Sequence, residues 1–236
     1  MPTQKFFLTE ALNTIPRTLG LCDRSEEAAT FGCCDRTYWH YRLTDFANAR
    51  FQEIGLLLAH AYRHATDDNP FYGNVAVLRW VGGIWNFWAE NRNGDGSVPE
   101  LYPEERCFCA TAFSAAAFVQ TADLLNGQDV SMPGLDVIEP TLRWLVQAKN
   151  PEVFNQMAGS YLALLGYANL TGDPKHLLWA EERRDDLLKL HKDGGELSEY
   201  GGFDAGYQSI SLSSLVSALE FTEHDTELKD LINMGK

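Results

Sequence analysis

The feature that most constrains the fold of this chain is a recurring succession of a polar, glycine-containing loop and a helix of small residues. The clearest copy runs from Asn91 to Phe118, where a loop rich in acidic, tyrosine and arginine residues leads directly into Ala110–Ala117. Similar units occupy Phe31–His64 and Gly194–Phe221, and a version with a short loop occupies Asn150–Asn169. A repeat of roughly 45–60 residues is the size of one helical hairpin. The pattern therefore predicts stacked helical hairpins.

Apolar periodicity and helix-start signals predict the individual helices. Asp173-Pro174 combines a capping residue with a first-turn proline, and Asn150-Pro151-Glu152 and Pro70 are interpreted in the same way. No segment shows a convincing period-two alternation, so we expect an all-α fold. Residues 1–30 are predicted to form an N-terminal helix and a connection, and residues 31–236 a single repeat domain. The expected helices cover about 8–19, 47–64, 70–90, 107–125, 140–148, 153–169, 176–191 and 208–221.

The size and net charge of the chain limit the kinds of partner that it can bind. A chain of 236 residues can form one domain with a substantial core. Its formal net charge of −14 disfavours nucleic acid and anionic membrane surfaces, since both bind basic proteins. No window approaches the ~20 apolar residues of a membrane span, and the first residues do not resemble a signal peptide.

The cysteines indicate a compartment. The chain has five of them, an odd number, placed as Cys22, a vicinal Cys33-Cys34 pair and a C-x-C at Cys107 and Cys109. This is a poor disulfide framework, and neither spacing matches the usual zinc-ligand pattern. We therefore expect a cytoplasmic protein with reduced thiols, without a metal or another cofactor.

The segments NRNGDGSVPE and ATAFSAAAF resemble the repeat of α/α-toroid proteins, in which inner helices surround a cavity and outer helices surround the inner ones. GCCDRTYWHYRLTDFANARFQE, LYPEERCFCATAFS and EYGGFDAGYQSISL are similar to heparinase II/III-like proteins encoded with bacterial surface-polysaccharide genes. The resemblance is at the level of pattern over most of Phe31–Phe221. The seven or eight expected helices are too few for a closed ring of hairpins, and no β-sandwich follows. The alternatives are a partial toroid, a homo-oligomer, or one domain of a larger system.

The toroid resemblance implies that the loops entering the inner helices share one rim and form a glycan-binding cleft there. Tyrosine and tryptophan suit sugar rings because they combine an apolar face with a polar tip. The expected catalytic residues are Tyr102, Tyr200, His40, Glu100, Glu199 and Asp204. The expected substrate-binding residues are Asp35, Arg36, Trp39, Tyr41, Arg50, Glu53, Glu105, Arg106 and Tyr207.

Several reactions remain open at such a cleft. Elimination from a uronate needs a tyrosine or histidine base and a cation beside the carboxylate. Hydrolysis needs two opposed carboxylates, such as Glu100 or Glu105 with Glu199 or Asp204. Epimerisation, glycan binding without turnover, and a terpenoid-type cavity are further alternatives, although no acidic terpenoid-cyclase motif is present. The same charged residues can also act structurally, as ion pairs that join loops to helices.

Overall fold

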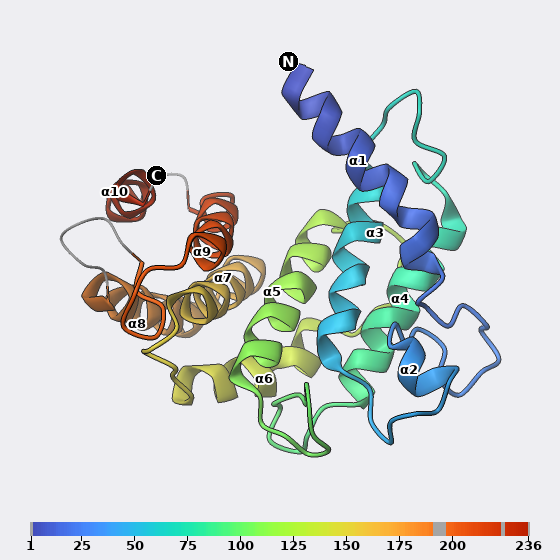
Figure 1. Cartoon of the computed structure of the whole chain (residues 1–236), viewed down its shortest axis with the longest axis horizontal. Helices are drawn as coiled ribbons and strands as arrows, with labels where there is room; N and C mark the ends of the chain where they lie inside the picture. The colour runs from blue at the N-terminus through green and yellow to red at the C-terminus, as the bar shows by residue number, and fades with distance from the viewer. Residues whose placement is uncertain (1, 191–196, 223–224, 236) are drawn as a thin grey trace.

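A computed structural model describes residues 2–190, 197–222 and 225–235. Helices are the regular secondary structure of these residues, which contain no β-strand (Figure 1). The glycine turn at Gly194 lies outside the described residues. Isolated β-bridges join Val153 to Glu199 and Glu199 to Gly202. The helices are α1 (Pro2–Leu19), α2 (Arg36–Trp39), a 3₁₀ turn η1 (Ala49–Glu53), α3 (Ile54–Arg63), α4 (Val75–Glu90), α5 (Phe108–Leu124), α6 (Leu135–Gln147), α7 (Phe154–Thr171), α8 (Pro174–Leu190), α9 (Ala205–Ala218) and α10 (Thr226–Met234).

The helices after the first connection alternate between two layers. Helix α5 packs against α3 and α7, and α7 packs against α9, so that these four helices form one row. Helices α4, α6, α8 and α10 each pack against the preceding member of the row. Figure 1 shows α4, α6 and α8 on the outer side of this inner row, with α10 beside α9. The described residues therefore form four consecutive helical hairpins.

The inner helices α5 and α7 run parallel to one another, and glycine contacts establish the direction. A Cβ atom on Gly159, near the start of α7, would lie 2.9 Å from the Phe113 ring near the start of α5. A Cβ atom on Gly166 would lie 2.9 Å from Val119 one to two turns further along. Residues near the start of α7 thus contact residues near the start of α5, and later residues contact later residues. As a result, the loops that enter α5 and α7 lie at the same end of the row.

Small residues in α5 allow this helix to be enclosed by its neighbours. Its alanines at 110, 112, 115, 116 and 117 are all buried, as the sequence predicted for a tightly packed helix. Bulky aromatics from α4 fill the space beside them: the rings of Trp85 and Trp88 contact Phe118 at centroid distances of 5.3 and 5.7 Å. Trp88 Nε1 donates to Ser114 Oγ at 3.0 Å, which satisfies both buried polar groups.

Three of the predicted helix-start signals are wrong. Asn150 does not cap α7 and Pro151 is not in its first turn, because the N-cap is Val153 and the helix begins at Phe154. Helix α4 begins at Val75, five residues after Pro70, because the Asn74 side chain accepts a hydrogen bond from the Ala76 amide and caps it. Pro140 lies inside α6, which already begins at Leu135. The start at Asp173-Pro174 is confirmed, with Asp173 Oδ1 accepting from the Lys175 amide at 2.9 Å. Helices α2 and α10 were not predicted.

The N-terminal helix joins the main core through its last turns. Ile15 and Leu19 of α1 are buried in the same apolar cluster as Leu58 of α3, whereas Phe6 and Phe7 are 59% and 65% exposed. No helix in the described part of the chain combines the length and the apolar character that crossing a bilayer requires.

A buried arginine joins α8 to α6 and α7. Arg183 is 2% exposed and donates to Ser160 Oγ and to the carbonyl oxygens of Leu145 and Ala148 at 2.6, 2.6 and 2.9 Å. Burial lowers the pKa of Arg183 to about 10, so the guanidinium is still charged at pH 7. The negative C-terminal end of the α6 dipole stabilises that charge.

We expect Arg183→Met to lower the free energy of unfolding by about 3 kcal/mol, because the carbonyls and Ser160 lose their donor inside the protein. Arg143→Met is the matched control, since Arg143 is an exposed residue of α6 paired with Glu139, and it should cost less than about 0.5 kcal/mol. Urea unfolding followed by circular dichroism measures both changes. Equal losses for the two variants would contradict this role of Arg183.

Candidate functional site

A groove of about 420 Å³ runs over the inner helices, and we call it the inner groove. Each inner helix contributes residues: the η1–α3 segment, α5, α7 and α9. Its walls are Glu53, Leu56, Leu57, His60, Phe113, Ala116, Ala117, Gln120, Leu162, Ser213, Ser214 and Ser217. The small residues of α5 and α9 explain the hollow, because alanine and serine leave space that larger side chains would fill.

The inner groove combines an apolar floor with hydrogen-bonding groups. Phe113 and the leucines supply apolar surface, while Gln120 and the serines of α9 supply an amide and hydroxyl groups. His60 adds an imidazole whose ring stacks on His64 at a centroid distance of 5.4 Å. Desolvation, together with the neighbouring His64, lowers the pKa of His60, so its ring is neutral at pH 7. Such a surface suits a ligand with both apolar faces and hydroxyl groups.

One end of the inner groove meets a set of charged and thiol groups, which we call the rim cluster: Arg50, Glu53, Glu100, Cys107 and Cys109. The Arg50 guanidinium forms an ion pair with Glu53, donates to Cys109 Sγ at 3.1 Å and lies 4.6 Å from the Phe113 ring centroid. The Cys107 thiol donates to Glu100 Oε2 at 3.1 Å. The rim cluster thus joins η1 to the loop before α5 and to the first turn of α5.

Glu53 is the carboxylate that connects the rim cluster to the groove. Burial raises its pKa and the charge of Glu100 raises it further, while the ion pair with Arg50 opposes the shift. Burial also raises the pKa of Cys107 to about 12 and raises the pKa of Cys109. The thiols therefore remain protonated at pH 7 and are poor nucleophiles. Glu53 is the more suitable group for acid–base chemistry.

The first predicted loop faces the end of α1. The Trp39 indole donates to Leu21 O at 2.8 Å, and Arg36 donates to Gly20 O at 3.0 Å while stacking on Tyr41. The His40 ring lies between its neighbours Trp39 and Tyr41, at centroid distances of 5.1 and 5.0 Å. None of these four residues lines the inner groove.

Asp35, from the same loop, is a buried capping residue. Its carboxylate accepts from the Thr37 amide, which starts α2, and from the Asn48 amide, which precedes η1, both at 3.0 Å. The two contacts fix both ends of the 35–48 loop. Its expected substrate-binding role stays a prediction, and its observed contacts are structural.

In the second loop, Glu105 is occupied by backbone amides. Its Oε2 accepts from the amides of Glu100, Leu101 and Tyr102 at 2.9, 2.6 and 3.3 Å. These bonds lower its pKa, although burial opposes them. Arg106 forms an ion pair with Asp95, and Tyr102 is 66% exposed. Glu105 thereby holds the segment that carries Glu100.

We expect Glu105→Gln to accelerate hydrogen exchange at the amides of residues 100–102, because a neutral amide oxygen accepts more weakly than a carboxylate. Glu104→Gln, an exposed neighbour, is the control. The pKa of Glu105 is lower in the folded state, so its contribution is present above the unfolded-state pKa and disappears as pH falls through the folded-state pKa. Exchange measured by mass spectrometry at pH 7 would contradict this account if both variants matched the wild type.

The third loop also uses its carboxylates for structure. Glu199 is 5% exposed, and its two oxygens accept from the Asn155 amide and side chain at 2.8 and 2.9 Å, which joins this loop to the start of α7. Asp204 caps α9 by accepting from the Tyr207 amide at 2.8 Å. Tyr200 and Tyr207 are 69% and 44% exposed. The catalytic roles expected for Glu199 and Asp204 remain predictions.

The structure thus brings three of the sequence-predicted residues into one cluster, namely Arg50, Glu53 and Glu100, and one of these, Glu53, lines the inner groove. The sequence analysis did not select His60, Phe113, Gln120, Ser213 or Ser217. The serines belong to the segment QSISLSSLVSALEF, which was predicted as a small-residue helix without site residues. One sequence signal could have indicated the groove: polar residues spaced one helical turn apart, such as Ser213 and Ser217, within helices predicted to be inner.

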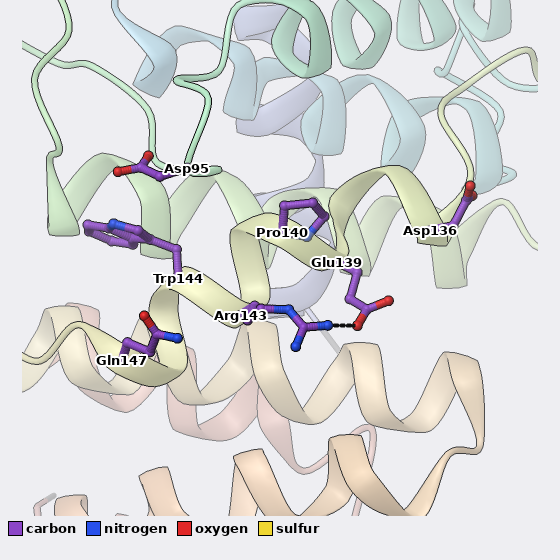
Figure 2. A pocket seen from close by; sticks show the side chains of 7 residues that line it. All are labelled: Asp95, Asp136, Glu139, Pro140, Arg143, Trp144 and Gln147. Atoms are coloured by element: carbon purple, nitrogen blue, oxygen red, sulfur yellow. Dashed lines mark hydrogen bonds and ion pairs between the residues drawn. The ribbon is translucent and has the colours of Figure 1, made fainter.

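A second hollow of about 300 Å³ lies over α6 (Figure 2). Figure 2 shows Asp95 and Trp144 at one end and Asp136 at the other, with the Arg143–Glu139 ion pair between them. Asp95 is itself paired with Arg106. Several charges of this hollow therefore already have protein partners, and the inner groove is the stronger candidate site.

Comparisons of this chain with protein-family models, with curated proteins and with solved structures found no match.

Proposed function

We propose that this protein is a carbohydrate-active protein that binds a neutral sugar unit of a glycan in the inner groove and hydrolyses the adjoining glycosidic bond. The observation that carries the proposal is the position of Glu53. This carboxylate, whose pKa burial raises, lies in the same groove as an aromatic ring, an amide and several hydroxyl groups. Apolar surface with a few convergent polar groups and a perturbed acid is the usual composition of a ligand site.

The groove chemistry favours a neutral sugar over a uronate. A sugar ring places its C–H face on an aromatic side chain such as Phe113, while Gln120 and Ser217 can exchange hydrogen bonds with its hydroxyls. A uronate carboxylate needs a cation, and Arg50, which lies against Phe113 of the groove, is already paired with Glu53. The electrostatic field of Glu53 and Glu100 disfavours a second negative charge.

Hydrolysis is favoured over elimination by the same residues. In its protonated form, which burial favours by raising its pKa, Glu53 acts as the general acid that protonates the leaving oxygen. Glu100, in the adjoining rim cluster, is the second carboxylate. Elimination from a uronate requires a base and also a cation beside the carboxylate. His60 could serve as the base in the groove, but Arg50 is already paired with Glu53, and Tyr102, Tyr200 and His40 do not line the groove. Epimerisation of a uronate lacks support for the same reason.

Within this proposal the fold is an incomplete α/α toroid related to heparinase II/III-like proteins, and it acts in the cytoplasm on a surface-polysaccharide glycan or its precursor. The two layers of helices and the parallel direction of α5 and α7 support the toroid interpretation. A homo-oligomer would enclose the open groove further. The chemistry of the proposal requires no cofactor.

A second function, glycan binding without turnover, is favoured by the contacts of Glu53. Both of its carboxylate oxygens interact with Arg50, through the ion pair at Nε and a 3.3 Å hydrogen bond from Nη2. A carboxylate held in this way can orient a ligand hydroxyl without transferring a proton.

A two-channel screen tests the proposal. The full chain is incubated with malto-, cello- and chito-oligosaccharides and with uronate polymers, and new reducing ends and unsaturated-product absorbance are followed together with binding by calorimetry. Hydrolysis predicts reducing ends without new absorbance on a neutral substrate. Binding without either signal supports the second function. Unsaturated products, or a folded protein that neither binds nor cleaves any of these sugars, would overturn the proposal.

A further inference from the structure

A pair of cysteine thiols outside the inner groove lies within contact distance. Cys22 follows α1 and Cys34 lies twelve residues later, and their Sγ atoms are 3.1 Å apart. Both residues are buried, at 4% and 0% exposure. Their pairing was not predicted, because the spacing of the five cysteines indicated a poor disulfide framework with reduced thiols. Close approach of two buried sulfur atoms is the geometric requirement for a disulfide.

The backbone around the pair holds this approach in place. The Asp23 amide donates to Cys33 O at 2.8 Å, and the Gly32 amide donates to Asp23 O at 2.9 Å, so residues 22–23 and 32–34 run side by side. Gln52 secures the second segment: its Oε1 accepts from the Cys34 amide at 2.7 Å, and its Nε2 donates to Gly32 O at 2.9 Å. Neither thiol can therefore move away without breaking buried hydrogen bonds.

The surroundings accommodate the reduced form as well. Cys22 Sγ lies 3.5 Å from Thr18 O, and Cys34 Sγ lies 3.5 Å from Gly32 O, so each thiol has a carbonyl acceptor. The third nearby thiol, Cys33, is directed elsewhere, with its Sγ 3.7 Å from Asp35 O. The site therefore distinguishes Cys34 from its neighbour in sequence.

We propose that Cys22 and Cys34 form a reversible intramolecular disulfide when the protein meets a small peroxide. The Cys22 sulfur attacks the peroxide, the O–O bond breaks, and a sulfenic acid and one water form. The Cys34 thiol then attacks this sulfur, the S–O bond breaks, and a second water leaves with the S–S bond formed. Two electrons and two protons pass from the thiols to the peroxide, and a dithiol such as dithiothreitol reverses the step.

The disulfide closes a short loop and ties the end of α1 to the segment that Gln52 anchors. Because the native sulfur positions are already close, the bond requires little backbone movement and should stabilise the fold. We expect the thermal midpoint of the oxidised protein to rise by about 5 to 10 °C over the reduced protein.

The test uses the full reduced chain, treated with one equivalent of hydrogen peroxide and then labelled with N-ethylmaleimide in denaturant. The expected product loses two labelling sites, and peptide mapping finds residues 22 and 34 in one disulfide-linked peptide. Cys33→Ser, the matched control, should form the same bond, whereas Cys22→Ser should not. The wild-type map does not depend on whether the variants fold.

A Cys33–Cys34 or Cys107–Cys109 bond in that map, or five labelled thiols after peroxide treatment, would overturn the proposal. The same holds if the bond forms but dithiothreitol does not restore five labelling sites. Thiol labelling and peptide mapping do not depend on any activity on sugars, so their results test the disulfide whether or not the proposed function is correct.

Discussion

Gly32→Ala is expected to lower the free energy of unfolding by more than about 3 kcal/mol, one of the two largest effects expected in this protein. Gly32 has a φ of +88°, and a Cβ atom there would lie 2.0 Å from Gly83 O and 2.1 Å from the Gly83 carbonyl carbon in α4. Both are backbone atoms inside a buried helix, so relief requires the loop to leave α4. Since small domains are stable by only about 5–15 kcal/mol, a substantial fraction of the variant should unfold on mild heating.

Gly127→Ala separates the close approach from backbone strain. Gly127 also has a positive φ, +77°, but no atom lies within 4 Å of the Cβ position. Only the left-handed conformation opposes alanine there, which costs about 1 kcal/mol. Urea unfolding of both variants measures the difference. Similar losses at Gly32 and Gly127 would show that the loop does not lie against α4 as described.

The second large effect concerns activity. We expect Glu53→Gln to reduce turnover of a cleaved oligosaccharide by about 10²- to 10⁴-fold, because glutamine cannot donate the proton that the leaving oxygen requires. Binding should change only a few-fold, since glutamine retains the shape and one acceptor. Initial rates and calorimetric binding with the same oligosaccharide separate the two effects.

The pH dependence of turnover tests the same role of Glu53 as general acid. Burial raises the pKa of Glu53, so as general acid it keeps its proton to a higher pH than an exposed glutamate. Wild-type turnover should therefore fall as pH rises through this raised pKa. Glu104→Gln, on the exposed part of the second loop, is the control and should retain wild-type rates and the same profile. Unchanged turnover in Glu53→Gln would remove Glu53 from the mechanism.

Much of the helical architecture could be predicted from the sequence, because local signals determine it. The alanines of α5 indicated a helix enclosed by others, and Asp173-Pro174 marked the first residue of α8 correctly. The helix starts predicted at Pro70 and Pro140 are wrong because proline also occurs outside the first turn of a helix. Pro70 lies in the loop before α4, and Pro140 lies inside α6. Asn74 and the residues around Leu135, which begin α4 and α6, carry weaker signals.

The site was less predictable, because the same carboxylate can serve a cap, an ion pair or a reaction. Asp204 caps α9, and Glu105 accepts hydrogen bonds from three backbone amides. The sequence alone does not distinguish either structural role from a catalytic one. The pairing of Glu53 with Arg50, three residues earlier, is local and was a structural alternative in the sequence, whereas its burial and its proximity to Glu100 depend on the fold. Groove residues such as Gln120 and Ser213 come together only once parallel helices pack in register, which depends on contacts between distant segments.

The most direct test of the central claim, that the inner groove holds the sugar, is a binding titration with one residue of the groove enlarged. Ser213→Phe places a ring in the groove from α9, and Ser209→Phe places the same ring on an exposed part of that helix outside the groove lining. Calorimetry with the best-binding oligosaccharide should show at least tenfold weaker binding for Ser213→Phe and unchanged binding for Ser209→Phe. Equal affinities for both folded variants would contradict the claim and place the ligand elsewhere.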